Sequence, residues 1–148
     1  MSDCLYTGDI FLKFGRQGRV QERRIHISKD KTTLYWKSSI FACKKPEDSI
    51  INLQTVTRLE QGQNTTNFKR KSAEYGGHVY NQCFSLITPT RSVDLMALSS
   101  DQFDTWFNGL AEILQQLHGE EFIVKRIQGD FHGGVYPEAR ANSLDRNC

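Results

Sequence analysis

The sequence lacks the features of a membrane-spanning protein, of a metal-binding protein and of a secreted protein. No run of about 18 apolar residues occurs, so no membrane-spanning helix is expected. The start, MSDCLYTGD, has neither the basic nor the apolar region of a signal peptide, which favours the cytoplasm. The four cysteines (positions 4, 43, 83 and 148) form no CxxC pair and no Cys/His cluster. Zinc and a redox dithiol are therefore disfavoured, and free thiols are predicted.

The sequence also lacks a recognisable arrangement of catalytic or cofactor-binding residues. No Ser/His/Asp trio is identifiable, and His26 alternates with Ile25 and Ile27 as a sheet-face histidine does. The GRQG stretch at residues 15–18 lacks the GK[ST] of a nucleotide-binding loop. No motif supports binding of nucleic acid. We therefore expect a non-enzymatic protein without a cofactor and without a nucleic-acid partner.

What the sequence does contain is one globular domain with a polarised charge. Its 148 residues are 38% hydrophobic and 24% charged, which is a globular composition. Residues 1–71 carry 14 Lys/Arg against 7 Asp/Glu, whereas residues 72–148 carry 5 against 10, which gives +7 and −5. Such a field orients a molecule towards an anionic partner. Charge alone leaves open a membrane surface, a phosphorylated ligand or nucleic acid.

Short strands are predicted for most of the first hundred residues. Residues 9–14 and 22–28 flank GRQGRVQ and predict a hairpin with a basic loop. Residues 32–37 and 49–63 predict two more strands. The segment CFSLITPTRSVDLMAL, residues 83–98, predicts a second hairpin that turns at ThrProThr. These strands follow one another without crossover helices, which excludes a parallel α/β enzyme.

The polar stretch at residues 64–81 is interpreted as a long loop, with a short strand at residues 66–70 as the alternative. Its Lys69-Arg70-Lys71 is interpreted either as a solvated face or as an auxiliary basic patch.

In the segment SSDQFDTWFNGLAEILQQLHG, residues 99–119, the spacing of the apolar residues changes from that of a strand to that of a helix. Its apolar residues, among them Phe103 and Trp106, follow the spacing of one helical face and are predicted to be core. Ser99 with Gln102 matches a capping box, and Gly119 provides a C-terminal stop. Gly109, inside the helix, predicts a close approach to the sheet. The architecture expected from these elements is an antiparallel barrel or sandwich closed by this helix.

This order of elements resembles the pleckstrin homology domain. The basic hairpin, YW at the third strand, the FSLI…RSVDLMA hairpin and Trp106 within FDTWFNGL carry the resemblance, which covers about residues 5–118. FLKFGRQGR, RLEQGQNTTNFKR and FSLITPTRSVDLMA are similar to the phospholipase C type and to plant proteins that add chromosome-condensation-type repeats and a FYVE finger. The resemblance implies a seven-stranded antiparallel barrel or sandwich capped by one C-terminal helix. The domain would span 5–119, with a partly disordered tail at 120–148.

The resemblance also implies a site for a phosphoinositide headgroup between the first and third hairpin loops. Lys13 at the end of strand one and Arg23 ten residues later match its lysine and arginine, whereas Gln21 replaces the middle basic residue. The remaining candidates add positive charge around this pair, and they are Arg16, Arg19, Arg24 and, from the facing loop, Lys37 or Lys44-Lys45.

The function implied is non-catalytic binding of anionic membrane lipids, which recruits the protein peripherally to membranes. The alternative is a protein-interaction module of the same fold with weak or no lipid affinity, and the neutral Gln21 keeps it open.

Overall fold

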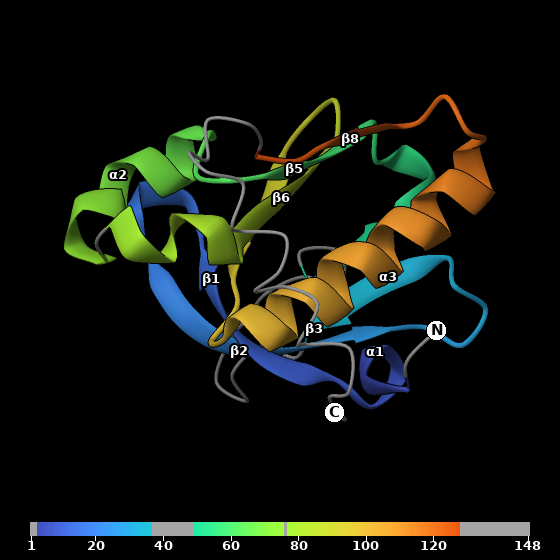
Figure 1. The fold of residues 1–148 in the computed structure, drawn as a ribbon, viewed down its shortest axis with the longest axis horizontal. Helices are drawn as coiled ribbons and strands as arrows, with labels where there is room; N and C mark the ends of the chain where they lie inside the picture. Colours follow the sequence, from blue (N-terminus) through green and yellow to red (C-terminus); the bar gives the residue numbers. More distant parts are fainter. Residues whose placement is uncertain (1–2, 37–48, 76, 128–148) are drawn as a thin grey trace, which may run out of the picture.

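One eight-stranded sheet curves around the hydrophobic core, and a long helix, α3, crosses its open side (Figure 1). The structure is a computed structural model that describes residues 3–36, 49–75 and 77–127. Its helices and strands are α1 (Cys4–Thr7), β1 (Asp9–Phe14), β2 (Val20–Ile27), β3 (Thr33–Trp36), β4 (Ile50–Asn52), β5 (Arg58–Gln61), α2 (Thr66–Tyr75), β6 (Cys83–Ile87), β7 (Ser92–Met96), α3 (Ser100–His118) and β8 (Ile123–Lys125).

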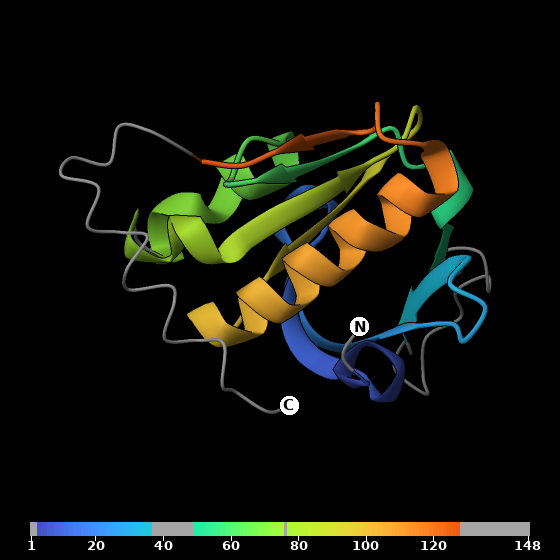
Figure 2. The same cartoon turned by 45° about the vertical axis from the view of Figure 1, so that its right-hand side comes forward.

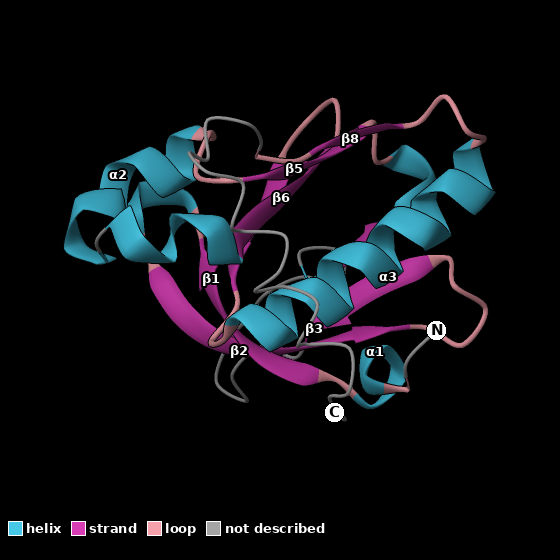
Figure 3. Ribbon diagram, viewed as in Figure 1, coloured by secondary structure: helices cyan, strands magenta, loops and turns pink. Residues whose placement is uncertain are grey.

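The strand order is β4-β3-β2-β1-β7-β6-β5-β8, and each pair is antiparallel except β5 with β8. Within the described part of the chain β4 pairs only with β3 and β8 only with β5, so the sheet has two edges and is not closed. Figure 3 shows these strands in magenta wrapped around α3. The predicted fold, mainly antiparallel β with a C-terminal helix, is confirmed with one strand more than the seven expected.

Helix α3 begins and ends where its capping residues predict. The Gln102 N–H donates to Ser99 Oγ at 3.0 Å, and Gly119 follows the helix with φ +98°. The predicted apolar face, which includes Phe103, Trp106 and Phe107, is buried. Trp106 also donates from Nε1 to Asp9 Oδ2 at 2.8 Å. Figure 2 shows α3 running across the inner side of the sheet, so this face completes the core.

Gly109 marks a close approach, but not the predicted one. A Cβ at this position would lie 2.8 Å from Leu5 Cδ2, and Leu5 belongs to α1. The short N-terminal helix therefore packs directly on α3, and the prediction that the sheet makes this contact is wrong.

The prediction of a long loop or a short strand after residue 63 is also wrong, because residues 66–75 form helix α2. The cause is tertiary packing. Phe68 is fully buried, and its ring centroid lies 4.8 Å from that of Phe14 on the outer side of the sheet. One buried phenylalanine in a polar segment produces no period that sequence analysis can recognise.

Two further segments differ from their predictions. Residues 49–63 are not one strand, because a turn at Leu53–Thr55 separates β4 from β5 and the two lie on opposite sides of the sheet order. Residues 123–125, expected in the tail, add β8 to the sheet, and Phe122 packs against the core. The boundary predicted at residue 119 leaves this strand outside the domain, and the extent of the folding unit stays a prediction.

The cysteines are not all free thiols as predicted. Cys4 is disulfide-bonded, whereas Cys83 keeps its thiol, which is fully buried beside Phe14 and Phe68. Burial raises the pKa of the Cys83 thiol to about 11, while a hydrogen bond from Gln63 opposes the shift. Cys83 therefore behaves as a small packed apolar residue.

Candidate functional site

A cavity of about 920 Å³ opens where the β1–β2 loop and the β6–β7 turn meet. Five basic side chains contribute to its lining, and they are Lys13, Arg16, Arg19, Arg58 and Arg91. Hydroxyl and amide side chains, such as Thr90 and Asn64, line it as well. Glu60 is the carboxylate of the lining, and it forms an ion pair with Arg58. The cavity is therefore open, polar and strongly electropositive, which suits a small polyanion.

Trp36 holds two of these cations over its ring. Lys13 Nζ lies 4.9 Å and Arg91 Cζ 5.7 Å from the ring centroid, and both distances are in the range of cation–π contacts. The Trp36 side chain is nearly buried, so its position is set by the core. Arg91 is further fixed by donating from Nη2 to the Ile50 carbonyl at 2.7 Å. The two positive groups are thus positioned by contacts within the protein itself.

The register of the sheet explains why Lys13 and Trp36 meet. Lys13 is paired with Leu95 of β7, and Trp36 with Ile25 of β2. Leu95 and Ile25 are both core residues, and directly paired residues point to the same face of a sheet. Lys13 and Trp36 therefore share the concave face, at the end of the sheet where the core opens into the cavity.

The structure brings only part of the predicted site together. Lys13, Arg16 and Arg19 line the cavity, whereas Arg23 and Arg24 are not among its lining residues. The Arg23 guanidinium donates to the Glu22 carbonyl and to Gln21 Oε1, and that of Arg24 donates to the Gly8 carbonyl. Being next to each other in β2, the two arginines point to opposite faces, and Arg24 is on the face away from Lys13. Lys37, Lys44 and Lys45 lie outside the described residues.

Arg58 and Arg91 line the cavity although neither was a predicted site residue. Arg91 had a signal in its position only, because it directly follows the ThrProThr turn of the second predicted hairpin. No feature of the sequence indicated Arg58, because residues 49–63 are predicted to form one strand. Its place beside the cavity depends on the separate pairing of β5 with β6, where Arg58 lies opposite Ile87.

One buried carboxylate, that of Asp94, holds residues of the cavity wall in place. Asp94 is completely buried, and its two oxygens accept four side-chain hydrogen bonds of 2.6 to 2.9 Å. The donors are Thr65 Oγ1, Asn67 Nδ2, Ser85 Oγ and Ser92 Oγ. Three of these donors also line the cavity. Asp94 thus joins the start of α2 to β6 and β7.

The β1–β2 loop, which carries Arg16 and Arg19, has a defined shape. The Gly15 N–H donates to the Arg19 carbonyl at 2.6 Å, which closes the loop around the short 3-10 turn Arg16–Gly18. Gly18 has φ +75°, and a Cβ there would lie 3.1 Å from Lys71 Cε of α2. Only glycine adopts this conformation readily, so Gly18 allows the loop to lie against α2.

The fold and this basic hairpin agree with a known family of domains. The sequence profile described as "Pleckstrin homology domain" matches residues 2–115. The chain belongs to the pleckstrin homology domain family. Its sequence is 25% identical over 122 residues to 1-phosphatidylinositol 4,5-bisphosphate phosphodiesterase eta-1 of mouse and of human. These matches cover 81% of this chain but 7% of the relatives, so the chain spans a small part of their length.

Solved structures show the same fold. Crystallised PLC21 of S. officinalis superposes with a TM-score of 0.58 at 16% identity, covering 77% of this chain and 16% of that one. The N-terminal pleckstrin homology domain of human ARAP2 gives 0.53 at 12% identity, covering 85% and 91% of the two chains. The resemblance to pleckstrin homology domains, and to the phospholipase C type at low identity, is thereby confirmed.

A search of the described residues finds no helix with the length and hydropathy needed to cross a bilayer. The same residues contain no group of three or more His, Cys, Asp or Glu that could hold a metal ion.

Proposed function

We propose that this pleckstrin homology domain binds the phosphorylated inositol headgroup of a membrane lipid in the cavity next to Trp36 and so attaches peripherally to membranes. The observation that carries the proposal is the convergence of Lys13, Arg16, Arg19 and Arg91 on one open cavity. Glu60 adds little opposing charge because it is paired with Arg58.

The lining suits phosphate groups for a chemical reason. Arginine presents a planar fork that can hold a phosphate through two hydrogen bonds, and lysine acts as a point charge. Lys13 and Arg91 are both held near the Trp36 ring, so an anion in the cavity meets two cations that are already positioned. Binding then requires little rearrangement of side chains.

The names of the phosphodiesterase relatives support the choice of ligand, because those proteins act on phosphatidylinositol 4,5-bisphosphate. The match lies within 7% of their length, so we do not transfer their hydrolytic activity. The proposal for this chain is therefore binding without catalysis.

A protein-interaction module with the same fold is the second candidate, and one observation favours it. Gln21 lines the cavity where the lipid-binding resemblance expects a basic residue, and its side-chain oxygen is already engaged by Arg23. A cavity with one cation fewer on β2 could instead hold an acidic peptide segment.

The test compares vesicles containing a bisphosphorylated phosphoinositide with vesicles of equal charge containing phosphatidylserine. The variant is Lys13→Met, which keeps an aliphatic chain over Trp36 and removes the charge. Charged hydrogen bonds contribute about 1.5–3 kcal/mol each, so phosphoinositide binding should fall about tenfold or more. The control is Arg24→Gln, which removes one charge from outside the cavity lining and should retain most of the binding. Equal binding by the parent and Lys13→Met, or no phosphoinositide preference in the parent, favours the protein-interaction module.

A further inference from the structure

Helix α2 has a basic side that points away from the sheet. Phe68 is fully buried against the sheet, and successive helical residues are rotated by about 100°. Lys69 and Arg70 are therefore directed away from Phe68, and both are exposed. Lys71, three residues after Phe68, returns towards the sheet and is half-buried. The two exposed charges stand on a helix that the sheet supports rather than on a free loop.

This side of α2 is continuous with the β1–β2 loop. The contact between Gly18 and Lys71 places the helix directly against the β1–β2 loop (Figure 1). This loop carries Arg16 and Arg19, both of which are exposed. Two elements far apart in sequence thus form one surface, which we name the α2 basic face. Its members are Arg16, Arg19, Lys69, Arg70 and Lys71.

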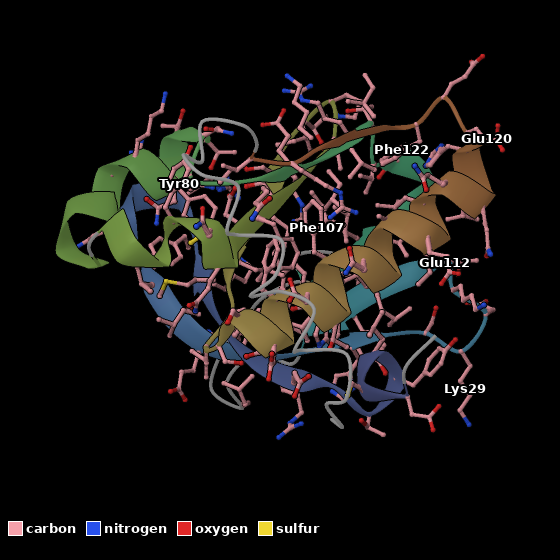
Figure 4. The ribbon with its side chains drawn as sticks, viewed as in Figure 1. Lys29, Tyr80, Phe107, Glu112, Glu120 and Phe122 are labelled. Carbon is pink, nitrogen blue, oxygen red and sulfur yellow. The ribbon has the colours of Figure 1, made fainter. Side chains whose placement is uncertain are left out.

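The exposed cations of this surface are not paired with described carboxylates. In the described ranges the recorded ion pair is Arg58–Glu60, so Arg16, Arg19, Lys69 and Arg70 form no ion pair with another described residue. Two exposed carboxylates lie elsewhere. Figure 4 labels Glu112 of α3 and Glu120, which follows α3, on the opposite side of the molecule from α2. The exposed cations of α2 and these two exposed carboxylates therefore lie apart on the fold.

The α2 basic face shares its border with the cavity. Arg16 and Arg19 belong to both, and the first residues of α2, Thr66 and Asn67, line the cavity wall. A lipid whose headgroup occupies the cavity remains anchored in a bilayer. The plane of that bilayer must then pass close to the β1–β2 loop and α2.

We propose that the α2 basic face lies on the anionic surface of the bilayer itself and contacts lipids such as phosphatidylserine outside the cavity. This inference rests on the proposed function, because the headgroup in the cavity brings the surface within reach. Attraction at the α2 basic face and repulsion at the acidic side of α3 together orient the domain, with α3 turned away from the membrane.

The experiment removes charge from α2 without changing the cavity lining. The variant is Lys69→Gln with Arg70→Gln, neither of which lines the cavity. The matched control is Lys29→Gln with Lys31→Asn, which removes the same charge from the β2–β3 turn. Lys31 has φ +65°, a conformation that asparagine tolerates, and Figure 4 shows Lys29 far from α2. Each protein is titrated with soluble inositol phosphate, with vesicles of phosphatidylcholine and the phosphoinositide, and with the same vesicles containing added phosphatidylserine.

Two basic residues at a charged surface correspond to about tenfold or stronger attraction. We expect Lys69→Gln/Arg70→Gln to bind soluble inositol phosphate like the parent and to bind phosphatidylserine-containing vesicles about tenfold more weakly. The control variant should lose much less affinity for these vesicles. Added salt should reduce the difference in vesicle affinity between Lys69→Gln/Arg70→Gln and the parent.

Three results would overturn the inference: equal vesicle binding by the variant and the parent, an equal loss in the control, or a parallel loss for the soluble ligand. A parent that binds no vesicle would also overturn it and would indicate an acidic protein as the partner of the α2 basic face. A parent that binds phosphatidylserine vesicles but no inositol phosphate would contradict the proposed cavity ligand and leave the α2 contact supported.

Discussion

The buried carboxylate of Asp94 provides the most demanding test of the structure. Oδ1 accepts from Thr65 Oγ1 and Ser85 Oγ, and Oδ2 accepts from Asn67 Nδ2 and Ser92 Oγ. Asp94→Asn preserves the shape of the side chain but places an NH₂ group where one oxygen was. The two groups that donated to the replaced oxygen then face another donor. The other two hydrogen bonds are made to a neutral oxygen in place of a charged one.

The expected cost follows from these four bonds. Loss of two charge-assisted hydrogen bonds at about 1.5–3 kcal/mol each gives about 3–6 kcal/mol, and rotation of one hydroxyl to accept from the new amide recovers about 1 kcal/mol. We therefore expect the free energy of unfolding to fall by about 2–5 kcal/mol. For a domain of this size that lowers the thermal midpoint by at least about 4 °C.

The assay is thermal and denaturant unfolding, combined with hydrogen exchange of peptides covering α2. Exchange in α2 should rise, because two of the four donors belong to the start of this helix. The matched control is Asp30→Asn. Asp30 also accepts hydrogen bonds from serine and threonine side chains, Ser28 and Thr32, but it is exposed to solvent, so its midpoint should stay close to that of the parent. If both variants shift the midpoint equally, or if Asp94→Asn has no effect, the described network is refuted.

Three further predictions concern the core, the last strand and the buried thiol. Trp106→Ala should cost about 3–5 kcal/mol, because the indole is fully buried and its Nε1 bond to Asp9 is lost, and an unchanged thermal midpoint would contradict this packing. A chain ending at Gly119 should still fold but should unfold about 2–3 kcal/mol more easily than one ending at Ile127, because it loses β8 and buried Phe122; equal stabilities would instead support the boundary predicted from sequence. Cys83 should resist iodoacetamide at pH 8 in the native state and react in denaturant, as peptide-resolved mass spectrometry can measure. Its native pKa of about 11 lies above the usual 9.0, so the stability it contributes is present below pH 9 and is lost as the pH rises through 11.

The site and the fold are connected through the same few residues. Trp36 belongs to the core through β3 and also positions Lys13 and Arg91 at the cavity. Asp94 holds the start of α2, and α2 in turn lies against the β1–β2 loop. A substitution in this set therefore changes stability and ligand binding together. Lys69 and Arg70, which project from α2 into solvent, are suited to separating membrane contact from folding.

The sequence by itself determined the elements whose pattern is local. Alternation of apolar residues predicted β1, β2, β6 and β7, and a helical period with its two capping residues predicted α3. The basic β1–β2 hairpin was equally readable, because the charges are close together in the chain. Such patterns work since one face of each element is buried, and burial leaves a period of 2 or about 3.6 residues.

Only the tertiary structure decided which elements meet. Helix α2 depends on the burial of Phe68 beside Phe14 and on the hydrogen bonds to Asp94, and β8 depends on pairing with a strand more than sixty residues earlier. The meeting of Lys13 with Arg91 over Trp36 depends on the registers of four strands. A shift of one residue in any pair would turn a side chain to the other face, as the exclusion of Arg24 from the cavity lining illustrates. Long-range register is set by the packing of the whole core, and no local stretch of the sequence contains it.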